Sequence, residues 1–430
     1  MVDHYDVVIV GAGPAGSTAG YFLAKAGLNV VIIERGKTPG SKNVSGGLLY
    51  SQPISGIFPE FWKDAPLERA ITGHQIVLLG KDTSSALDFR SHSAGSPPYN
   101  CFSVLRSRFD PWLAKKAEDA GALLVPGISV DSLLIEDGKV IGVQAGQDKL
   151  EANITIIADG SRSLLLKQSA LREGFSAQDV SLGIKEIILL SPNVLEERFQ
   201  CSSSTGMAYT LVGSTNGVEG GGFIYTNKES LSVGVVVKIR SLAKSKMQPH
   251  QVLDAFKSHP FVSRLVEGGK IAEYSAQIVH RGGYQATAKL FGDGFITIGS
   301  AARLLLNNVV TLRGMDFAVI SANVAAKVVQ QASSRGDFGS KSLSSYEANL
   351  KGTAIYQDWS TFKDVYALMD NQRLFDVYPD LLGGVMEDLF TPSSEPAEKP
   401  FRNLRKKMSR KVSMLDLARD AWQAGKGILF

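Results

Sequence analysis

A glycine-rich turn near the N-terminus constrains the fold of this chain more than any other feature. Gly11, Gly13 and Gly16 follow directly after the apolar run Tyr5–Val10, in the pattern Gly-x-Gly-x-x-Gly. A stretch with helical apolar spacing comes next, and then a second apolar run that ends at Glu34. A strand, a glycine turn, a helix and a strand in this order predict a parallel-sheet unit that binds a dinucleotide.

The three glycines have separate physical roles in such a unit. Gly11 permits the tight turn, Gly13 lets a pyrophosphate approach the backbone, and Gly16 lets the helix pack on the strand. The helix N-terminus offers N–H groups and a positive dipole end to the phosphates, and Glu34 would accept hydrogen bonds from a ribose. The residues predicted to bind the adenosine diphosphate half of a cofactor are Gly11, Gly13, Pro14, Ala15, Gly16, Glu34 and Arg35.

Later apolar runs extend this sheet. Ile154–Ala158 and Phe295–Gly299 predict further buried parallel strands, and residues 314–331 have the spacing of a long apolar helix. Strands dominate from 180 to 240, whereas residues 36–96 carry many turn residues and are predicted to be irregular. The order favours an α/β fold in which a β-sheet domain interrupts a nucleotide-binding domain.

This reading divides the chain into three regions. The nucleotide-binding domain is expected in the segments 1–80, 100–175 and 285–335. The β-rich domain is expected in 80–100 and 176–284, and a helical C-terminal region with a basic tail in 336–430.

Composition and charge exclude several classes of protein. Lys plus Arg number 46 and Asp plus Glu 42, and a net charge of +4 gives no reason to expect nucleic-acid binding. The two cysteines, Cys101 and Cys201, cannot supply four thiolates to an iron–sulfur cluster or a zinc ion, and they favour a reducing compartment. The six histidines show no metal-binding spacing. We find no signal peptide and no run of about 18 apolar residues, so we expect a cytoplasmic protein with at most peripheral membrane contact.

The C-terminal part contains a basic stretch, defined here as Lys399–Lys411. Its seven basic residues are Lys399, Arg402, Arg405, Lys406, Lys407, Arg410 and Lys411. It is either a solvated surface or a contact for anionic lipid or an acidic partner. The residues Val412–Phe430 have apolar side chains at helical spacing, and they form either an interfacial helix or a helix packed on the domain.

Two further motifs resemble a known fold. Arg106 opens a predicted helix, and Asp159 and Gly160 follow the strand that ends at Ala158. Together with the N-terminal motif, this arrangement is similar to the glutathione-reductase-type fold of FAD-dependent monooxygenases and reductases. The resemblance implies that the first motif holds the ADP of FAD and that Arg106, Asp159 and Gly160 lie close to FAD. By itself, an Asp-Gly pair is also common in turns and hairpins that bind nothing.

A longer series of motifs narrows this resemblance. The series is Gly40–Gly47 (GSKNVSGG), Ser103–Arg106 (SVLR), Gly183–Glu186 (GIKE), Gly220–Asn227 (GGGFIYTN), Glu273–Ala276 (EYSA) and Arg313–Ala318 (RGMDFA). In this order, from about residue 5 to the C-terminus, the chain resembles the FixC family, relatives of electron transfer flavoprotein–ubiquinone oxidoreductase.

The resemblance implies an FAD-dependent oxidoreductase that accepts electrons from an electron transfer flavoprotein and passes them to quinone. It implies an FAD-binding Rossmann-like domain interrupted by a β-rich substrate or quinone domain. A separate ferredoxin-like subunit of the FixX type would supply an iron–sulfur cluster, which agrees with the two cysteines. The further FAD-binding residues that it implies are Asn43, Ser45, Gly46, Gly47, Arg106, Val130, Asp159, Gly160, Gly299, Ser300, Arg313, Gly314 and Met315.

A physical argument supports the last of these motifs. Gly314 can open the long helix with its backbone close to the flavin ring. The positive end of that helix would then face N1 and O2, where negative charge collects on the reduced flavin. Without the family resemblance, Gly314 could equally turn the chain into a packing helix.

One motif departs from the family pattern. Where relatives have Gly-Asp-Ala-Ala-Gly, this chain has Gly299-Ser300-Ala301-Ala302-Arg303. Ser300 replaces an acid that would bind FAD. Arg303 replaces a glycine that would allow a close approach, and it adds a bulky side chain or a cation near the phosphates. The departure leaves open a non-catalytic relative with impaired FAD binding. A second alternative is a geranylgeranyl-reductase-like enzyme that saturates isoprenoid double bonds.

Overall fold

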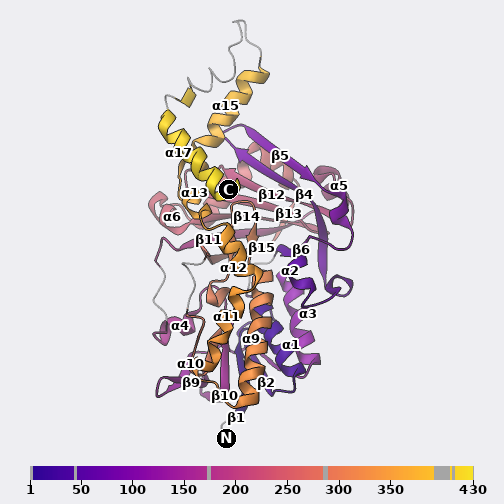
Figure 1. Ribbon diagram of the computed structural model, residues 1–430. Coiled ribbons are helices and arrows are strands. Elements are labelled where there is room, and N and C mark those ends of the chain that lie inside the picture. The colour runs from indigo at the N-terminus through magenta and orange to yellow at the C-terminus, as the bar shows by residue number, and fades with distance from the viewer. Residues whose placement is uncertain are drawn as a thin grey trace.

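The computed structural model of the chain describes residues 3–42, 46–171, 176–283, 289–391, 407–408 and 412–429. These residues form two large β-sheets, one in each half of an elongated molecule (Figure 1). The N-terminus lies at the end beside the first sheet, and the last helices lie towards the opposite end (Figure 1). The predicted α/β class, with a Rossmann-like part, a β-rich part and C-terminal helices, is confirmed.

The first sheet is the predicted parallel sheet. Its strands follow the order β16-β17-β10-β1-β2-β7, so the strand near residue 155 lies between the first and the last of the predicted strands. The parallel strands are β1 (Asp3–Val10), β2 (Val30–Glu34), β7 (Leu123–Pro126), β10 (Asp148–Ile157) and β17 (Phe295–Thr297). The antiparallel additions are β8 (Ser132–Glu136), β9 (Lys139–Ala145) and β16 (Phe291–Gly292).

Helices cover the first sheet and share a core with it. α1 (Pro14–Lys25) packs against α3 (Arg106–Asp119) and α9 (Met315–Arg335), and α11 (Ser345–Lys351) lies beside α9 (Figure 1). Alternate strand residues such as Val7 and Ile9 are fully buried in this core, together with Phe317 and Trp359. The other helices of this half are α2 (Gln52–Ser55), α4 (Leu164–Gln168), α10 (Ser340–Leu343), α11 (Ser345–Lys351) and α12 (Ala354–Thr361), with the short helices η1 (Phe61–Lys63) and η4 (Gly299–Ala302).

The second sheet is largely antiparallel. Its order is β15-β11-β14-β13-β12-β4-β6-β3, with β5 beside β4. The strands are β3 (Gly47–Tyr50), β4 (Leu67–Leu79), β5 (Ser84–Arg90), β6 (Cys101–Val104), β11 (Val180–Leu189), β12 (Thr205–Gly213), β13 (Gly220–Thr226), β14 (Ser230–Lys238) and β15 (Lys270–His280). The predicted pairing of residues 222–226 with 230–238 is present between β13 and β14.

The two faces of the second sheet differ. One face carries Ile184, Ile224 and Val235 and is closed by a layer of helices. This layer comprises α5 (Pro192–Phe199), α6 (Ile239–Ser245), α7 (Pro249–Ser258) and α8 (Pro260–Val266). Because strand side chains alternate, the residues between these face the other way, towards the half that contains the first sheet.

The prediction that residues 36–96 are irregular is wrong. This segment contributes the strands β3, β4 and β5 and the short helix η2 (His92–Gly95). Turn residues such as Gly80 and the serines hide the strands. β5 exposes nearly all its residues, Leu87 and Phe89 among them, so its short apolar pattern does not mark a buried face. The expected domain boundaries stay a prediction, although β3, β4 and β6 pair into the second sheet and not the first.

The C-terminal region is helical. It contains α13 (Val365–Met369), α14 (Arg373–Asp376), α15 (Tyr378–Phe390), α17 (Met414–Ala424) and η5 (Gly425–Leu429). The Arg373 guanidinium pairs with both carboxylate oxygens of Asp420 at 2.7 and 2.8 Å, so α14 holds α17 in place. Among the described residues, no helix is both long and apolar enough to cross a membrane.

A buried arginine ties together the loops at one end of the second sheet. Arg69 on β4 is 1% exposed. Its guanidinium donates hydrogen bonds to four backbone carbonyls, those of Ser202, Thr205 (3.3 Å), Asn227 (2.7 Å) and Lys228 (3.1 Å). Glu196 lies 3.5 Å away and balances the charge. Arg69 thus joins the start of β12 to the turn between β13 and β14.

We therefore expect Arg69→Met to lower the free energy of unfolding by about 3–5 kcal/mol, because it leaves buried acceptors and a carboxylate uncompensated. Urea unfolding followed by circular dichroism measures this. Arg90→Met is the matched control, since Arg90 is 32% exposed and pairs with Asp88 at the surface, and it should cost about 1 kcal/mol or less. Equal effects of the two changes would contradict the assigned role of Arg69.

Candidate cofactor site and acceptor pocket

The turn between β1 and α1 is fixed by close backbone contacts. Gly11 has a φ of +102°, and a Cβ there would lie 2.5 Å from the carbonyl oxygen of Ala158. A Cβ at Gly16 would lie 1.8 Å from the carbonyl oxygen of Gly11. No side chain fits at either position, so both glycines are required by the protein itself.

Gly13 differs from these two glycines. A Cβ at Gly13 would meet only the Arg106 guanidinium, at an ordinary contact distance of 3.5 Å. The protein therefore tolerates a small side chain here, and the glycine leaves space directly before the N-terminus of α1. No side chain caps that N-terminus, although Pro14 begins the helix. An uncapped helix start beside open space is a suitable binding place for a phosphate.

Glu34 links the ends of two strands. Its carboxylate accepts hydrogen bonds from the backbone N–H groups of Ala12 at 2.9 Å and Gly36 at 2.7 Å. The side chain is 8% exposed. The carboxylate thus helps to hold the glycine turn, a structural role that the sequence did not indicate. A carboxylate has further lone pairs, so its predicted contact with a ribose is compatible with these bonds.

Arg106 lies on the other side of the glycine turn. Its Nε and one terminal nitrogen each donate to Asp110 at 2.6 Å, and the side chain is 20% exposed. Burial would lower the pKa of the guanidinium, but Asp110 and Glu34 outweigh this effect and raise it. A permanent positive charge therefore lies beside Gly13, where a phosphate would be placed.

The segment that departs from the family pattern packs on the same turn. A Cβ at Gly299 would lie 2.8 Å from the Cβ of Ala15, so η4 touches the start of α1 and places the half-buried Ser300 near it. Arg303 has a left-handed φ of +59°, which favours glycine at this position. Burial lowers the pKa of Arg303, against the opposing charge of Asp179. The weaker FAD binding expected from Ser300 and Arg303 stays a prediction.

The motif at residues 313–315 joins the two halves. Gly314 begins α9, and the Met315 Cε lies 3.3 Å from where a Cβ of Gly47 would be. The Arg313 guanidinium is held by Asp316 at 2.6 Å and by Asp358. The structure therefore brings Gly47, Gly314 and Met315 together, while Arg313 braces the N-terminus of α9.

The remaining predicted residues have different environments. Asp159 and Gly160 follow β10 beside Gly11, and Leu165 N–H approaches the Asp159 carboxylate at 3.5 Å. Val130 packs against the core of the first sheet, and Arg35 is exposed. Asn43 and Ser45 lie outside the described residues.

Gly46 and Lys185 bring the chain before β3 against β11 and β14 of the second sheet. A Cβ at Gly46 would lie 2.1 Å from the Ser232 hydroxyl on β14. The Lys185 ammonium on β11 donates a hydrogen bond to the Gly46 carbonyl. The sequence contained Lys185 in the GIKE motif but gave it no role, because only the strand register reveals which side it faces.

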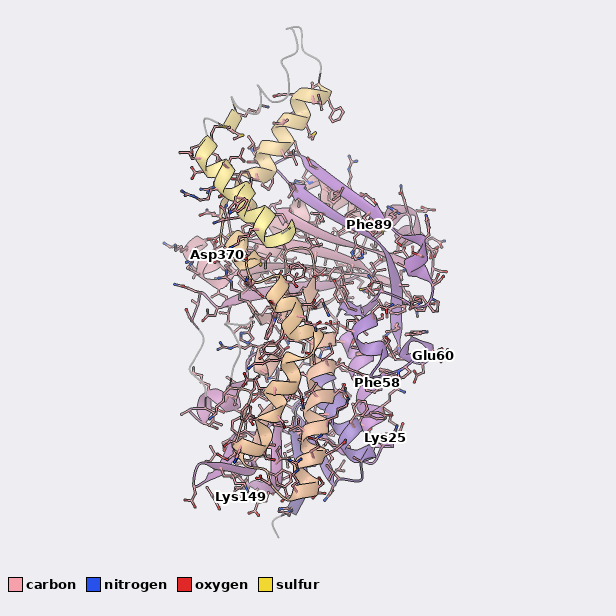
Figure 2. All side chains as sticks on the ribbon, in the orientation of Figure 1. Lys25, Phe58, Glu60, Phe89, Lys149 and Asp370 are labelled. Atoms are coloured by element: carbon pink, nitrogen blue, oxygen red, sulfur yellow. The ribbon has the colours of Figure 1, made fainter. Side chains whose placement is uncertain are left out.

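A cavity of about 130 Å³ lies on the same face of the second sheet. Its lining includes Thr210, Phe223, Tyr225 and Val279 from the sheet, and Leu312 from the hairpin before α9. Phe223 and Tyr225 stack at 4.9 Å between ring centroids. α13 and α14 contribute Met369, Asp370 and Phe375, and Figure 2 shows Asp370 at the edge of this half of the molecule.

Comparison with known proteins identifies relatives of this chain. Family models match residues 2–55 (Thi4 family), 180–279 (electron transfer flavoprotein–quinone oxidoreductase, ubiquinone-binding) and 365–429 (ETF-QO/FixC family C-terminal domain). The chain is 40% identical to the probable electron transfer flavoprotein-quinone oxidoreductase YdiS of Escherichia coli K12 over 419 residues, 97% of each chain. It is 40% identical to Protein FixC of the same strain over 422 residues, again 97% of each.

The fold also resembles solved structures. A geranylgeranyl bacteriochlorophyll reductase-like protein from Thermoplasma acidophilum superposes with a TM-score of 0.73 and 20% identity, covering 99% of this chain and 100% of that one. At this identity the likeness concerns the fold. FAD is the cofactor of this chain, and the open space at Gly13, the uncapped helix and the charge of Arg106 fit the pyrophosphate of such a group.

Gly13→Val tests this placement. We expect the purified variant to contain little or no FAD, because its side chain fills the space beside the N-terminus of α1 while it meets only a guanidinium. FAD content per chain, measured after heat release, is the readout. Gly56→Val is the matched control, because a Cβ at Gly56 meets nothing within 4 Å. Stoichiometric FAD in the Gly13 variant would contradict the assignment.

Proposed function

The chain belongs to the ETF-QO/FixC family of FAD-dependent oxidoreductases, and we propose that it passes electrons from FAD to a quinone bound in the cavity of the second sheet. One observation carries this proposal. Leu312 lines the cavity, and Gly314, two residues later, begins the helix whose start meets Gly47. Cavity and candidate flavin site are therefore adjacent.

The residues of this chain divide the task of holding the cofactor. The glycine turn, the N-terminus of α1 and Arg106 would bind the pyrophosphate, and Glu34 the ribose. Gly47, Gly314 and Met315 would lie at the flavin ring. FAD supplies the ability to accept two electrons and release them in one or two steps. The protein sets the distance to the acceptor and needs no acid–base residue for electron transfer itself.

The chemistry of the cavity suits a quinone. Phe223 and Tyr225 offer aromatic faces to a flat ring, while Val279, Leu312 and Met369 offer apolar contacts to an isoprenoid chain. The ubiquinone-binding family model spans residues 180–279, which include most of the sheet residues of this lining. The cavity also has polar groups at its edge, among them Thr210 and Asp370.

Thr210→Trp should block the acceptor and leave the cofactor in place. We expect the oxidation of the dithionite-reduced protein by a short-chain ubiquinone to slow at least about tenfold, because an indole fills the cavity. Stopped-flow absorbance of the flavin measures this rate, and FAD content should not change.

Thr210→Val is the control for the lost hydroxyl. The Thr210 hydroxyl donates to the Val310 carbonyl at 3.2 Å, and valine removes this bond without filling the cavity. Unchanged quinone reactivity in the tryptophan variant would place the acceptor elsewhere.

For the electron donor we propose an electron transfer flavoprotein, and for an iron–sulfur partner a ferredoxin-like subunit. The support is the 40% identity to a probable electron transfer flavoprotein-quinone oxidoreductase over 97% of both chains. The two cysteines among these 430 residues cannot form a four-thiolate cluster, so the thiolates of any such cluster must come from outside them. Reduction of the bound FAD by a reduced electron transfer flavoprotein, with and without the candidate partner, tests both proposals.

We propose that the end of the molecule formed by α15 and α17 contacts the membrane that holds the quinone. Leu389 and Phe390 at the end of α15 are 53% and 77% exposed, and Leu415 at the start of α17 is 81% exposed. These helices lie at the end of the molecule opposite the N-terminus (Figure 1). The basic stretch joins them in the sequence, and Lys or Arg contributes about 1 kcal/mol each near an anionic leaflet.

We expect binding to anionic phospholipid vesicles that weakens as salt rises, because screening acts over about 10 Å at 0.1 M. Deleting residues 399–430 would also remove the Arg373–Asp420 pair, so substitutions are the cleaner test. Phe390→Ser with Leu415→Ser should reduce vesicle co-sedimentation. Leu87→Ser with Phe89→Ser is the control, because both are exposed on β5, as Figure 2 shows for Phe89. Loss of binding in the control alone would move the contact to β5.

A further inference from the structure

A lysine lies between the candidate flavin site and the acceptor cavity. Lys185 is on β11, and its neighbours Ile184 and Glu186 point into the helix layer, where Glu186 pairs with Lys257 of α7 at 2.8 Å. Because side chains alternate along a strand, Lys185 points to the opposite face of the sheet. It therefore faces the half of the molecule that holds the cofactor.

The register of three strands explains why the lysine can extend across this face. Phe223 of β13 pairs with Gly234 of β14, and Gly234 pairs with Lys185 of β11. Gly234 has no side chain, and a Cβ there would lie 2.5 Å from the Phe223 ring. The Phe223 ring therefore lies over Gly234, next to Lys185, and the Lys185 ammonium is 5.7 Å from the centre of this ring, which lines the acceptor cavity.

The same ammonium group also contacts the segment beside the candidate flavin site. It donates a hydrogen bond to the carbonyl of Gly46. The next residue, Gly47, meets Met315 at the start of α9. The Lys185 ammonium thus contacts Gly46, next to the candidate position of the flavin ring, and also lies near Phe223, which lines the cavity.

The charges around Lys185 are unbalanced. Burial is the largest influence on its pKa, the Arg106 guanidinium acts in the same direction, and Glu273 on β15 opposes them. Together they lower the pKa of Lys185 from 10.5 to about 7. Arg106 from α3 and Glu273 from β15 are the charged groups acting on it among the described residues. Glu273 acts only at a distance, and no carboxylate of the described residues forms an ion pair with the Lys185 ammonium, which leaves its charge available to a ligand.

We propose that Lys185 is a charge-compensating residue for electron transfer, whose ammonium group stabilises the negative charge that FAD gains on reduction. The inference rests on the proposed function, because it needs the flavin ring at Gly47 and Gly314. Reduction adds two electrons from the donor and one proton from solvent, so one negative charge remains on the ring system. A cation enclosed in a medium of low polarity stabilises that charge strongly.

The test is the ratio of the affinities for reduced and oxidised FAD, measured as the midpoint potential. Lys185→Met keeps an unbranched, flexible side chain that is one atom shorter, and it removes the charge. At pH 6 we expect the ratio of the affinity for reduced FAD to the affinity for oxidised FAD to be at least tenfold lower in this variant. The midpoint potential would then fall by about 30 mV for a two-electron couple. Lys185→Arg should have a midpoint potential close to that of the wild type, because it keeps the positive charge. Lys228→Met, at an exposed lysine in the β13–β14 turn, is the matched control and should not change it.

The pH dependence gives a second signature. Below pH 7 the lysine is charged in both oxidation states, so wild type and Lys185→Met differ most there. As pH rises, the lysine loses its proton and the two potentials should converge, whereas the Lys185→Arg potential should stay above that of Lys185→Met throughout. A constant difference across pH 6–10 would contradict the proposal.

A measurement on the protein without FAD completes the design. Reductive methylation with ¹³C-formaldehyde allows the titration of each lysine to be followed by NMR. The Lys185 signal, assigned by its loss in Lys185→Met, should titrate well below the exposed lysines. If FAD binds and quinone oxidises it but the Lys185→Met potential is unchanged, this inference fails alone. If no FAD is bound, or if quinone does not oxidise the reduced protein, the proposed function fails.

Discussion

The close contact between the Gly16 backbone and the carbonyl oxygen of Gly11 determines where everything else in the site can lie. It sets α1 directly on β1, and α1 in turn receives η4 through Ala15 and Gly299. Glu34 fastens the same turn from β2 through the N–H of Ala12. The consecutive elements β1, α1 and β2 and the distant segment η4 therefore converge on one helix N-terminus.

Polar contacts attach the chain before β3 to the rest of the second sheet, beside the apolar cluster through which the two halves of the molecule meet. Lys185 donates to the carbonyl of Gly46, and the Gln277 side chain donates to the carbonyl of Lys42 at 2.7 Å. These bonds attach the loop before β3 to β11 and β15. Because β3 itself pairs with β6 in the second sheet, the loop belongs physically to both halves. A quinone in the cavity and a flavin beside Gly47 would share this boundary.

Much of the fold follows from local sequence, whereas the boundary between the sites does not. The strands near residues 5, 30, 155 and 295 are apolar on both sides, so they can be predicted, and the glycine turn identifies β1 and α1. β4 was missed because turn residues surround it and its partner β5 is exposed. The predicted Gly47, Gly314 and Met315 do converge. The roles of Arg69 and Lys185 depend on strand register, which no local pattern encodes.

The Arg373–Asp420 pair has a consequence for the basic stretch. α15 ends at Phe390, and α17, which this pair fastens to α14, begins at Met414. The helices on both sides of residues 391–413 are therefore fixed within the same half of the molecule. Within the basic stretch, the Lys407 ammonium pairs with Asp388 of α15 at 2.7 Å and donates to the Gly384 carbonyl at 2.6 Å. Part of the positive charge that the sequence places here is thus already neutralised by the protein, and a docking surface would have to compete with α15 for it.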